Sequence, residues 1–377
     1  MYVSNIHLNN FRNYRSFDLE LSDGVTVFYG KNGLGKTNIL EAVFLSVIGK
    51  SFRNCKDTDL ITYGENEYST EIKVSDDITE NITVKYEKNK EKYVKVNGFY
   101  LRKLGHLMGN LLSVIFSPED LQLITEGPSE RRKFMDIAIS QLTPSYYFDL
   151  LQFNKILAQK NSLLKKIKYQ NAKEDRVFLE VLNDQLSDVG SKIICNRYEF
   201  INEISLLASK SNEKISGKEV LNIQYDSGSF GDEYIYEINL KDIKEVKERL
   251  FTIMQSKVEK EIEREISYIG PHRDDIIFKL NQNDIKRFGS QGQKRTAVLS
   301  LKMAEVEILR QKSGRKPILL LDDVLSELDI QRQRALIESL RDIQTLITCT
   351  HIDKTLEKYS GYHAIPLEKL VEKNSLK

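Results

Sequence analysis

The stretch VTVFYGKNGLGKTN, residues 25–38, decides the fold class. It opens with an apolar, β-branched and aromatic run, which predicts a buried strand that ends at Gly30. Residues 30–37 then match the pattern G-x-x-x-x-G-K-[ST] in full. Glycines let a backbone turn closely around phosphate groups, and a helix that begins at Lys36 adds the positive end of its dipole. We therefore predict a phosphate-binding loop between a strand and a helix, rather than a glycine-rich turn without a ligand.

The residues of this loop have different expected tasks. Lys36 is expected to reach the β- and γ-phosphates of a nucleoside triphosphate, and the Thr37 hydroxyl to ligate Mg²⁺. The predicted nucleotide-binding residues are Gly30, Lys31, Asn32, Gly33, Leu34, Gly35, Lys36, Thr37 and Asn38. The motif leaves open what the nucleotide is for, because kinases, GTPases, transporter ATPases and DNA-repair ATPases share it.

Composition limits the remaining possibilities. The chain has 377 residues, enough for one large domain or two moderate ones. Its 56 Lys and Arg against 55 Asp and Glu exclude a globally basic protein but not a basic patch. The cysteines, Cys55, Cys195 and Cys349, have neither metal-type nor disulfide-type spacing, and we find no signal peptide. No apolar run approaches the roughly 20 residues that span a bilayer, so we expect a cytoplasmic protein without a membrane segment.

The pattern of the chain predicts an α/β domain built from both ends, with helices inserted between. The first third alternates like strands, and residues 67–97 indicate a small antiparallel β-excursion. In the middle, two apolar stripes at three/four spacing predict two long amphipathic helices folded back on each other as an arm, with the stripes as their shared core. The expected division is an ATPase-type head from 1–122 and 262–377, and a mainly helical arm from 123–261.

A second candidate site lies in PILLLDD, residues 317–323. The apolar run predicts a buried parallel strand that ends in two carboxylates. At the carboxyl edge of such a sheet, Asp322 would hold Mg²⁺, and Asp323 would orient or deprotonate water. The alternative is a helix N-cap with a second acidic residue beside it. The complete phosphate loop elsewhere in the chain favours the functional interpretation.

A third candidate is FGSQGQKR, residues 288–295, where a glycine-bearing turn enters an amphipathic helix. Ser290 and the first N–H groups of that helix would form another anion-binding helix start. By itself this is an ordinary serine N-cap. Its position just upstream of the Asp322 strand favours a functional interpretation.

These motifs, in this order, resemble the ABC-type ATPase head that transporters share with SMC-like chromosome proteins. The fold class expected from the resemblance is α/β, an ABC/SMC-type P-loop head with an inserted long-helix arm. The resemblance gives the signature as Ser290, Gln291, Gly292 and Gln293, the D-loop as SELD with Ser326 and Asp329, and the switch histidine as His351. It gives Asp323, Lys36 and His351 as catalytic residues, and Thr37 and Asp322 as Mg²⁺ ligands.

Further segments narrow the resemblance to the RecF family of bacterial recombination-mediator ATPases. They are LNNFRNYRSFDLEL, GKSFR, FSPEDLQLITEGPSERRKFMD and GPHRDD. The match covers nearly the whole chain, and a compact helical arm is also typical of this family. For GPHRDD, residues 270–275, the sequence suggests no role beyond proximity to the nucleotide.

Two positions depart from the ABC pattern. Asp323 stands where most ABC ATPases have glutamate, and the shorter side chain retracts the base by about one C–C bond, which predicts slow hydrolysis. No glutamine stands clearly in the place of a Q-loop, and Gln122 is a weak candidate.

The resemblance implies ATP and Mg²⁺ as ligands and an ATP-dependent homodimer. The signature of one subunit would cap the ATP held by the other, and hydrolysis would release the pair. It also implies DNA as a partner, double-stranded and with single/double-strand junctions, together with RecR and RecO-like mediators. Arg53 would reach either ATP or DNA. The candidate DNA contacts are Arg12, Arg15, Arg131 and Arg132, for which a solvated surface stays the alternative.

Two other functions compete with this one. A transporter-type subunit would have a short helical insert and a clear Q-loop. A small-molecule or nucleotide kinase would not need SQGQ or the D-loop.

Overall fold

The structure is a computed structural model that describes residues 1–76, 78–170, 173–228, 230, 238–339, 342–352, 361–368 and 370. The chain forms two compact units. The first contains residues 1–121, 210–219 and 291–377, and the second contains residues 122–209 and 220–290. Residues 262–290 thus belong to the mainly helical unit, whereas the sequence-based division placed them in the head. That functional division stays a prediction. No described helix has the length and apolar character to cross a membrane.

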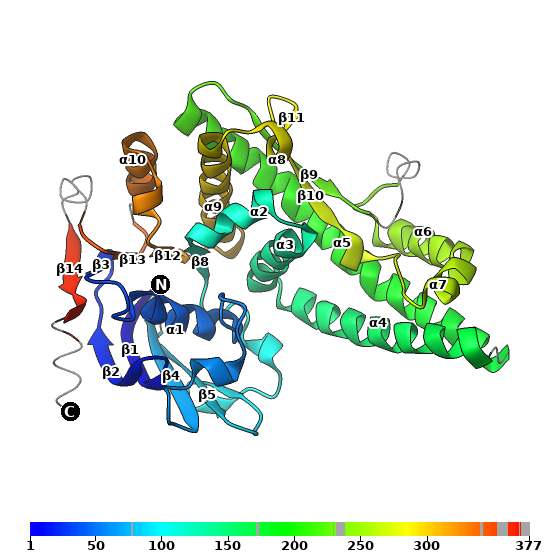
Figure 1. Cartoon of the computed structure of the whole chain (residues 1–377), viewed down its shortest axis with the longest axis horizontal. Coiled ribbons are helices and arrows are strands. Elements are labelled where there is room, and N and C mark those ends of the chain that lie inside the picture. Colours follow the sequence, from blue (N-terminus) through cyan, green and yellow to red (C-terminus); the bar gives the residue numbers. More distant parts are fainter. Residues whose placement is uncertain are drawn as a thin grey trace. The chain divides into compact units, whose positions relative to one another are not determined.

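A parallel sheet of five strands forms the centre of the first unit, in the order β14-β3-β13-β12-β8 (Figure 1). Every residue of β12 and β13 is buried, as expected for strands covered on both faces. Because the strands are parallel, the chain leaves β3 and β12 at the same edge, on either side of β13. The strands are β3 (Val25–Tyr29), β8 (Ser113–Phe116), β12 (Ile318–Asp322), β13 (Thr345–Cys349) and β14 (Tyr362–Pro366).

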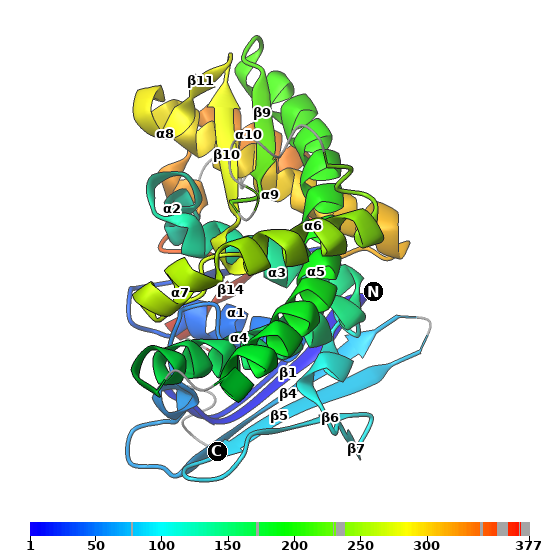
Figure 2. The same cartoon turned by 90° about the vertical axis from the view of Figure 1, so that its right-hand side faces the viewer.

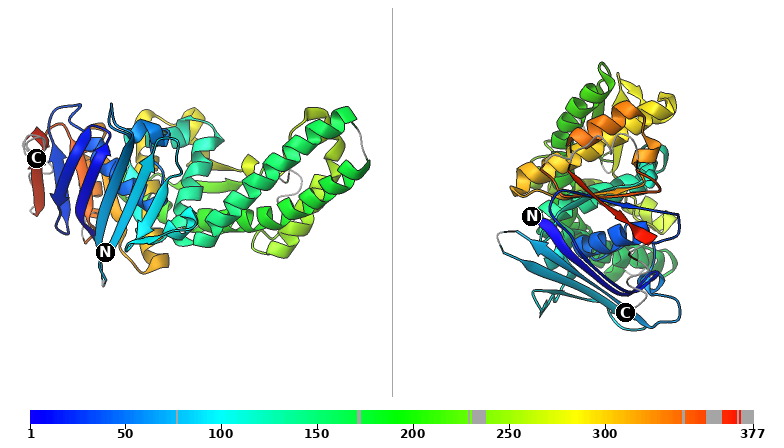
Figure 3. Two further views of the ribbon diagram at one scale, coloured as in Figure 1. Left: turned by 90° about the horizontal axis from the view of Figure 1, so that it is seen from below. Right: turned by 90° about the vertical axis from the view of Figure 1, so that its left-hand side faces the viewer.

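A second, antiparallel sheet in this unit has the order β2-β1-β4-β5-β6-β7. The predicted excursion at residues 67–97 is therefore part of a six-stranded sheet that also contains the N-terminal strands (Figure 3). Alternate residues such as Ile6, Leu8, Ile72 and Ile82 are buried, which leaves one face of the sheet polar. The strands are β1 (Tyr2–Phe11), β2 (Tyr14–Glu20), β4 (Glu67–Ser75), β5 (Glu80–Glu87), β6 (Tyr93–Val96) and β7 (Phe99–Tyr100).

Helix α1 (Lys36–Ile48) contacts both sheets. Its residues from Ile39 to Ile48 are all buried, because the helix has a sheet on each side. This unit also contains α9 (Gln291–Ser313) and α10 (Ile330–Ser339). The phosphate loop is thus fixed at both ends, by the inner strand β3 and by a helix that is buried from Ile39 onward.

The second unit is mainly helical, and its two longest helices run as an antiparallel pair (Figure 2). Most of the first predicted stripe is buried, as at Leu182, Leu186 and Ile193, although its first residue, Phe178, is 50% exposed. The second predicted stripe was largely wrong: Leu164 is buried, but Tyr147, Leu150 and Leu157 are half-buried, and the buried face of that helix contains Phe153, Ile156 and Leu163 instead. A small antiparallel sheet has the order β11-β10-β9. The elements are α2 (Gln122–Thr125), α3 (Pro128–Leu142), α4 (Pro144–Gln170), α5 (Lys173–Ser216, whose last residues belong to the first unit), β9 (Leu221–Asp226), α6 (Ile243–Ser256), α7 (Val258–Arg264), β10 (Asp275–Leu280), β11 (Asn283–Asp284) and α8 (Ile285–Phe288). Short 3-10 turns occur at Asp57–Leu60, Leu104–Leu107, Pro118–Leu121, Pro271–Arg273 and Leu325–Glu327.

Candidate nucleotide site

The predicted phosphate loop connects the end of β3 to the start of α1. Gly30, Gly33 and Gly35 have φ values of 145°, 85° and 95°, which side chains other than glycine rarely adopt. The buried Lys36 side chain lies across the loop, and its Nζ donates to Gly30 O at 2.7 Å and to Lys31 O at 2.9 Å. The glycines therefore form a tight loop with an ammonium group inside it, as a phosphate cradle requires.

The two predicted Mg²⁺ ligands lie in contact. Thr37 Oγ1 donates to Asp322 Oδ1 at 2.7 Å, and Thr348 Oγ1, from the end of β13, donates to the same oxygen at 2.7 Å. Burial raises the pKa of Asp322, and the two hydroxyl groups act in the opposite direction. The phosphate loop and the aspartate strand thus meet at one point, although 285 residues separate them in sequence.

The residues at this point fit a magnesium ion. A hydroxyl and a carboxylate oxygen face each other, and Mg²⁺ prefers hard oxygen ligands, with one or two carboxylates completed by substrate phosphates. Among the described residues, no group of three His, Cys, Asp or Glu is placed to hold a metal without such a substrate. Thr348 was missed by the sequence reasoning, which had no signal for it beyond its place at the end of a buried strand.

Asp323 and His351 follow the adjacent strands β12 and β13. Asp323 has φ 52°, a left-handed conformation that is rare for aspartate, and its N–H donates to Thr348 O at 3.1 Å. Its Oδ1 atom is buried without a hydrogen-bond partner among the described residues. His351 is exposed, and its Nδ1 lies 3.0 Å from Thr350 Oγ1. Both residues therefore lie at the sheet edge where the phosphate loop begins, and their catalytic roles stay predictions.

The start of α9 is joined to the predicted D-loop by two arginines that the sequence reasoning did not single out. Arg332 Nε donates to Thr296 Oγ1 at 2.7 Å and its Nη2 donates to Gly292 O at 3.1 Å, while Nη1 pairs with Asp329. Arg295 Nη1 donates to Glu327 O at 2.7 Å, and Nη2 pairs with the Glu327 carboxylate. The first turn of α9 and the residues after β12 are thus held as one surface.

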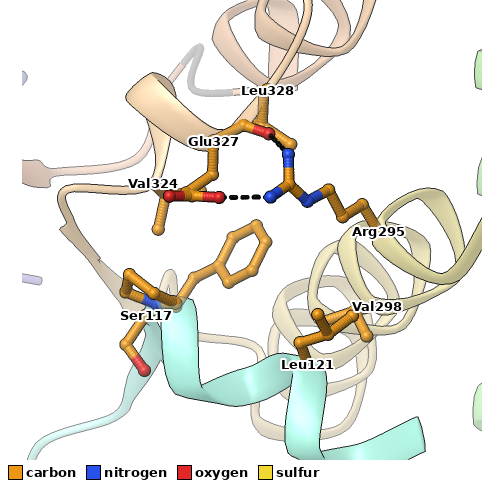
Figure 4. A pocket seen from close by; sticks show the side chains of 9 residues that line it. Ser117, Leu121, Arg295, Val298, Val324, Glu327 and Leu328 are labelled. Carbon is orange, nitrogen blue, oxygen red and sulfur yellow. Dashed lines mark hydrogen bonds and ion pairs between the residues drawn. The ribbon is translucent and has the colours of Figure 1, made fainter. Parts of the chain in front are cut away.

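Figure 4 shows the second of these links beside a small pocket. Arg295 comes from α9 and reaches Glu327, above an apolar lining. The pocket is lined by Phe116, Ser117, Pro118, Leu121, Arg295, Val298, Val324, Glu327 and Leu328.

The other signature residues have separate positions. Ser290 is the last residue of the second unit, and Gln291 begins α9 in the first unit. Gln293 Nε2 donates to Glu219 Oε1 at 2.6 Å. In the D-loop, Ser326 Oγ donates to Asp323 O at 2.8 Å, which fixes the backbone directly after the aspartate pair. Gln122, the weak Q-loop candidate, is exposed at the start of α2.

A buried carboxylate near the phosphate loop organises three of the predicted binding residues. Glu41 is fully buried and accepts from Arg12 through both oxygens, Nε to Oε2 at 2.8 Å and Nη2 to Oε1 at 2.6 Å. Arg53 Nη1 lies 3.7 Å from Glu41 Oε2 and donates to Asn38 Oδ1 at 3.1 Å. Arg53 is therefore held beside the start of α1, whereas Arg12 is engaged with the interior of the protein.

A second carboxylate lies at the other side of the loop. Glu368, which follows β14, accepts a hydrogen bond from Lys31 N at 3.1 Å. A Cβ atom on Gly30 would lie 2.7 Å from the same carboxylate, which would have to move aside, and the φ value of 145° already requires glycine at this position. The N–H groups of Glu368 and Lys31 lower the pKa of this carboxyl group. No sequence motif pointed to Glu368.

The candidate DNA contacts are dispersed. Arg15 is exposed on β2, and Arg132 is half-buried, with Nη1 donating to Asp274 O at 2.8 Å. Arg131 is 5% exposed and binds both carboxylate oxygens of Asp275, at 2.5 and 2.9 Å. The structure does not support a phosphate contact by Arg131, because its guanidinium is buried and already paired. Arg12, Arg15 and Arg132 stay predictions.

GPHRDD, residues 270–275, is an anchor inside the second unit. The buried Asp274 accepts from Arg197 Nη1 at 2.8 Å and from Tyr225 Oη at 2.5 Å, and burial raises its pKa to about 6. Arg197 also donates to Pro271 O at 2.6 Å. Burial lowers the pKa of His272 to about 4. The charged residues of this segment therefore hold α3, α5, β9 and β10 together.

The fold and these motifs define a P-loop ATPase head of the ABC and SMC type with an inserted arm of long helices. Residues 2–370 match the family of the RecF/RecN/SMC N terminal domain. The Smc head domain of Pyrococcus furiosus, with its extended coiled coil bound to ScpA, superposes with a TM-score of 0.53 at 16% identity. The superposition covers 100% of this chain and 99% of the Smc chain. At this sequence identity, the similarity shows a shared fold only.

Closer relatives define the particular family. The DNA replication and repair protein RecF of Acetivibrio thermocellus is 44% identical over 94% of each chain, and that of Clostridium botulinum is 42% identical over 95% of this chain and 96% of its own. The structure of the recombination mediator protein RecF-ATPrS in the RecFOR pathway superposes with a TM-score of 0.88, at 38% identity and over 97% and 96% of the two chains. The chain belongs to the RecF family of DNA replication and repair proteins.

Proposed function

We propose that this protein binds MgATP at the site between Gly30 and Asp322 and that ATP closes two copies of the chain on DNA. The observation that carries the proposal is the 2.7 Å hydrogen bond from Thr37 to Asp322, because it unites the phosphate loop with the carboxylate strand in one site. Membership of the RecF family supports it, since relatives have been solved as RecF-ATP and RecF-ATPrS.

The residues of the site then have defined tasks. The loop N–H groups and Lys36 bind the phosphates, which replace the backbone carbonyls as partners of the ammonium group. Thr37 and Asp322 hold Mg²⁺, which neutralises the charge that develops on the transferred phosphoryl group. Asp323 accepts the proton of the attacking water, with His351 beside the γ-phosphate. Because aspartate is shorter than glutamate, hydrolysis is slow and acts as the release step.

Dimerisation is the proposed role of the signature. Ser290 to Gln293 bind the γ-phosphate of the nucleotide held by the other copy, and Asp329 contacts the loop of that copy. ATP then touches two chains only in the dimer, so it stabilises the dimer by its additional contacts. The contacts of Arg295 and Arg332 support this role, because they hold the first turn of α9 and the D-loop together.

The closed dimer is proposed to hold DNA at gaps or single/double-strand junctions, where it aids recombinase loading with RecR and RecO-like mediators. Family membership supports this, and the similar solved structure is that of a recombination mediator protein in the RecFOR pathway. Phosphate contacts dominate such binding, so the affinity falls steeply with salt concentration. DNA stimulates the weak ATPase because it favours the closed dimer in which the composite site is complete.

Gel filtration with light scattering tests the proposal, using the full chain with ATP and Mg²⁺, with and without gapped duplex DNA. The wild type should become dimeric only with ATP. Lys36→Met should abolish dimerisation through loss of nucleotide binding, whereas Ser290→Arg should bind ATP and stay monomeric. A chain that stays monomeric with ATP and binds no DNA at low salt would contradict the proposal.

A further inference from the structure

The free edge of the antiparallel sheet carries an exposed aromatic hairpin, formed by β6 and β7 (Figure 2). Phe99 is 78% exposed and Tyr100 is 63% exposed. Asn97 and Gly98, with φ values of 52° and 81°, make a two-residue turn between the strands. Such turns match the twist of the strands, so the hairpin presents these rings with little conformational freedom.

The contacts of Tyr100 involve its edge and one cation. Tyr100 contacts Tyr93 edge-on, with centroids 5.3 Å apart and planes at 65°, an arrangement that does not stack one ring on the other. Lys95 lies opposite Tyr100 in the strand register, and its Nζ is 4.4 Å from the Tyr100 ring centroid. The ammonium group therefore lies over the Tyr100 ring, which is still more than half exposed.

The hairpin is also basic. The segment KYVKVNGFYLRK, residues 92–103, contains four Lys or Arg and no Asp or Glu. Lys92 pairs with Asp57 at 2.7 Å. Among the described residues, no carboxylate lies within ion-pair distance of Lys95 or Arg102, and Arg102 is exposed. Two exposed rings on the edge strand thus lie close to two cations, Lys95 on the neighbouring strand and Arg102 after β7.

We infer that this hairpin is a contact site for a single DNA strand that crosses the edge of the sheet, in which bases stack on Phe99 and Tyr100, on the two faces of β7, while Lys95 and Arg102 bind the adjoining phosphates. Single strands are bound in this way because every base has a face that stacks on an aromatic ring, and every base carries a phosphate next to it. A duplex hides its base faces, so the rings discriminate between the two forms. Charge complementarity favours a polyanion over an apolar protein surface, since Lys95 lies over the Tyr100 ring and Arg102 follows two residues later.

The inference deepens the proposed function, on which it rests, by placing the single-stranded side of a junction at this edge. The chain contains no tryptophan. Tyr100→Trp therefore creates a single fluorescent reporter within the hairpin. Tyr63→Trp is the matched control, because Tyr63 is 98% exposed. Its neighbour Ile61 bridges to Phe11 at the end of β1, and three strands separate β1 from β7 in the sheet.

The experiment titrates both reporter proteins with oligo-dT and with a duplex of equal length at low salt. Oligo-dT should quench the fluorescence of Tyr100→Trp and leave that of Tyr63→Trp unchanged. Phe99→Ala and Tyr100→Ala should each weaken binding of labelled oligo-dT by about tenfold, with duplex binding and ATP-dependent dimerisation retained. Lys95→Gln should reduce the salt dependence of oligo-dT binding by about one charge.

Several outcomes would overturn the inference. They are absence of quenching at oligo-dT concentrations that saturate binding, equal quenching of both reporters, and an equal loss of single-strand and duplex binding in the alanine variants. Loss of recruitment of a mediator protein with unchanged oligo-dT affinity would also overturn it. Failure of the wild type to bind any DNA would instead reject the proposed function, so the two failures are distinguishable.

Discussion

Replacing Arg332 with alanine should weaken ATP-dependent dimerisation without weakening ATP binding by the single chain. The Arg332 guanidinium donates to Thr296 Oγ1 and to Gly292 O, and it pairs with Asp329. It therefore connects the first turn of α9 with the D-loop. The proposal places both against the nucleotide held by the other copy, whereas the phosphate loop of the same copy has no contact with Arg332 among those described.

The size of the effect follows from these contacts. Two hydrogen bonds from a charged donor contribute about 0.5–1.5 kcal/mol each, and the partly exposed ion pair with Asp329 adds about 0–1 kcal/mol. Without them, the signature turn and the D-loop must be ordered when the dimer forms. Together these contributions amount to about 1–4 kcal/mol, which raises the dissociation constant of the dimer about fivefold to a thousandfold.

Light scattering over a range of protein concentrations with ATP and Mg²⁺ measures this constant. Binding of a fluorescent ATP analogue, at concentrations where the chain is monomeric, gives the affinity of the phosphate loop. Arg334→Ala is the matched control, because Arg334 is exposed on the same helix and its substitution removes the same charge. An unchanged dissociation constant in Arg332→Ala, or an equal rise in Arg334→Ala, would refute the reasoning.

Three further perturbations test the site and the fold. Thr348→Val removes a hydroxyl that holds Asp322. Loss of such a supporting contact typically lowers metal affinity about 10–100-fold, so the Mg²⁺ concentration for half-maximal ATPase activity should rise by that factor. An unchanged Mg²⁺ requirement would contradict the assignment of Asp322 as a ligand. Glu368→Gln keeps an acceptor for Lys31 N but removes a negative charge beside the phosphate loop. ATP should therefore bind about 2–5-fold more tightly at low salt, and high salt should abolish this gain. Isothermal titration calorimetry measures both affinities. Burial raises the pKa of Asp274 from 3.8 to about 6, so the folded chain binds this proton more tightly than the unfolded chain, and the contribution to stability is complete below about pH 4 and lost as the pH rises through 6. Asp274→Asn should therefore flatten the dependence of the urea unfolding midpoint on pH between 4 and 6, and a slope equal to that of the wild type would show that another group titrates there.

The local motifs could be predicted from the sequence because each depends on a short run of residues. The strand before Gly30, the helix after Lys36 and the buried strand before Asp322 all follow from periodicity and from glycine conformations that neighbouring residues dictate. The two long helices of the arm also follow from their apolar stripes. What this reasoning could not give was the partner of each side chain. Arg131 belongs to a conspicuous basic cluster in the sequence, yet it is buried against Asp275, 144 residues away.

The antiparallel sheet shows the same limit. Residues 67–97 were recognisable as strands, but their pairing with the N-terminal strand β1 depends on which edges meet in three dimensions. The hairpin at Asn97 and Gly98 is local and has a sequence signal, whereas its place at the free edge of six strands has none.

The sequence by itself determined the class of site. The phosphate loop, the carboxylate strand, the signature and the D-loop are each a short continuous run of residues, and their order can be read along the chain. Only the tertiary structure decided how they meet: parallel strands on either side of β13 bring Thr37 and Asp322 to 2.7 Å, with Thr348 between them. The physical reason is that a metal site, a buried ion pair or a shared surface consists of contacts between distant residues. Such contacts are fixed by sheet order and packing, whereas propensity and spacing act only over a few residues.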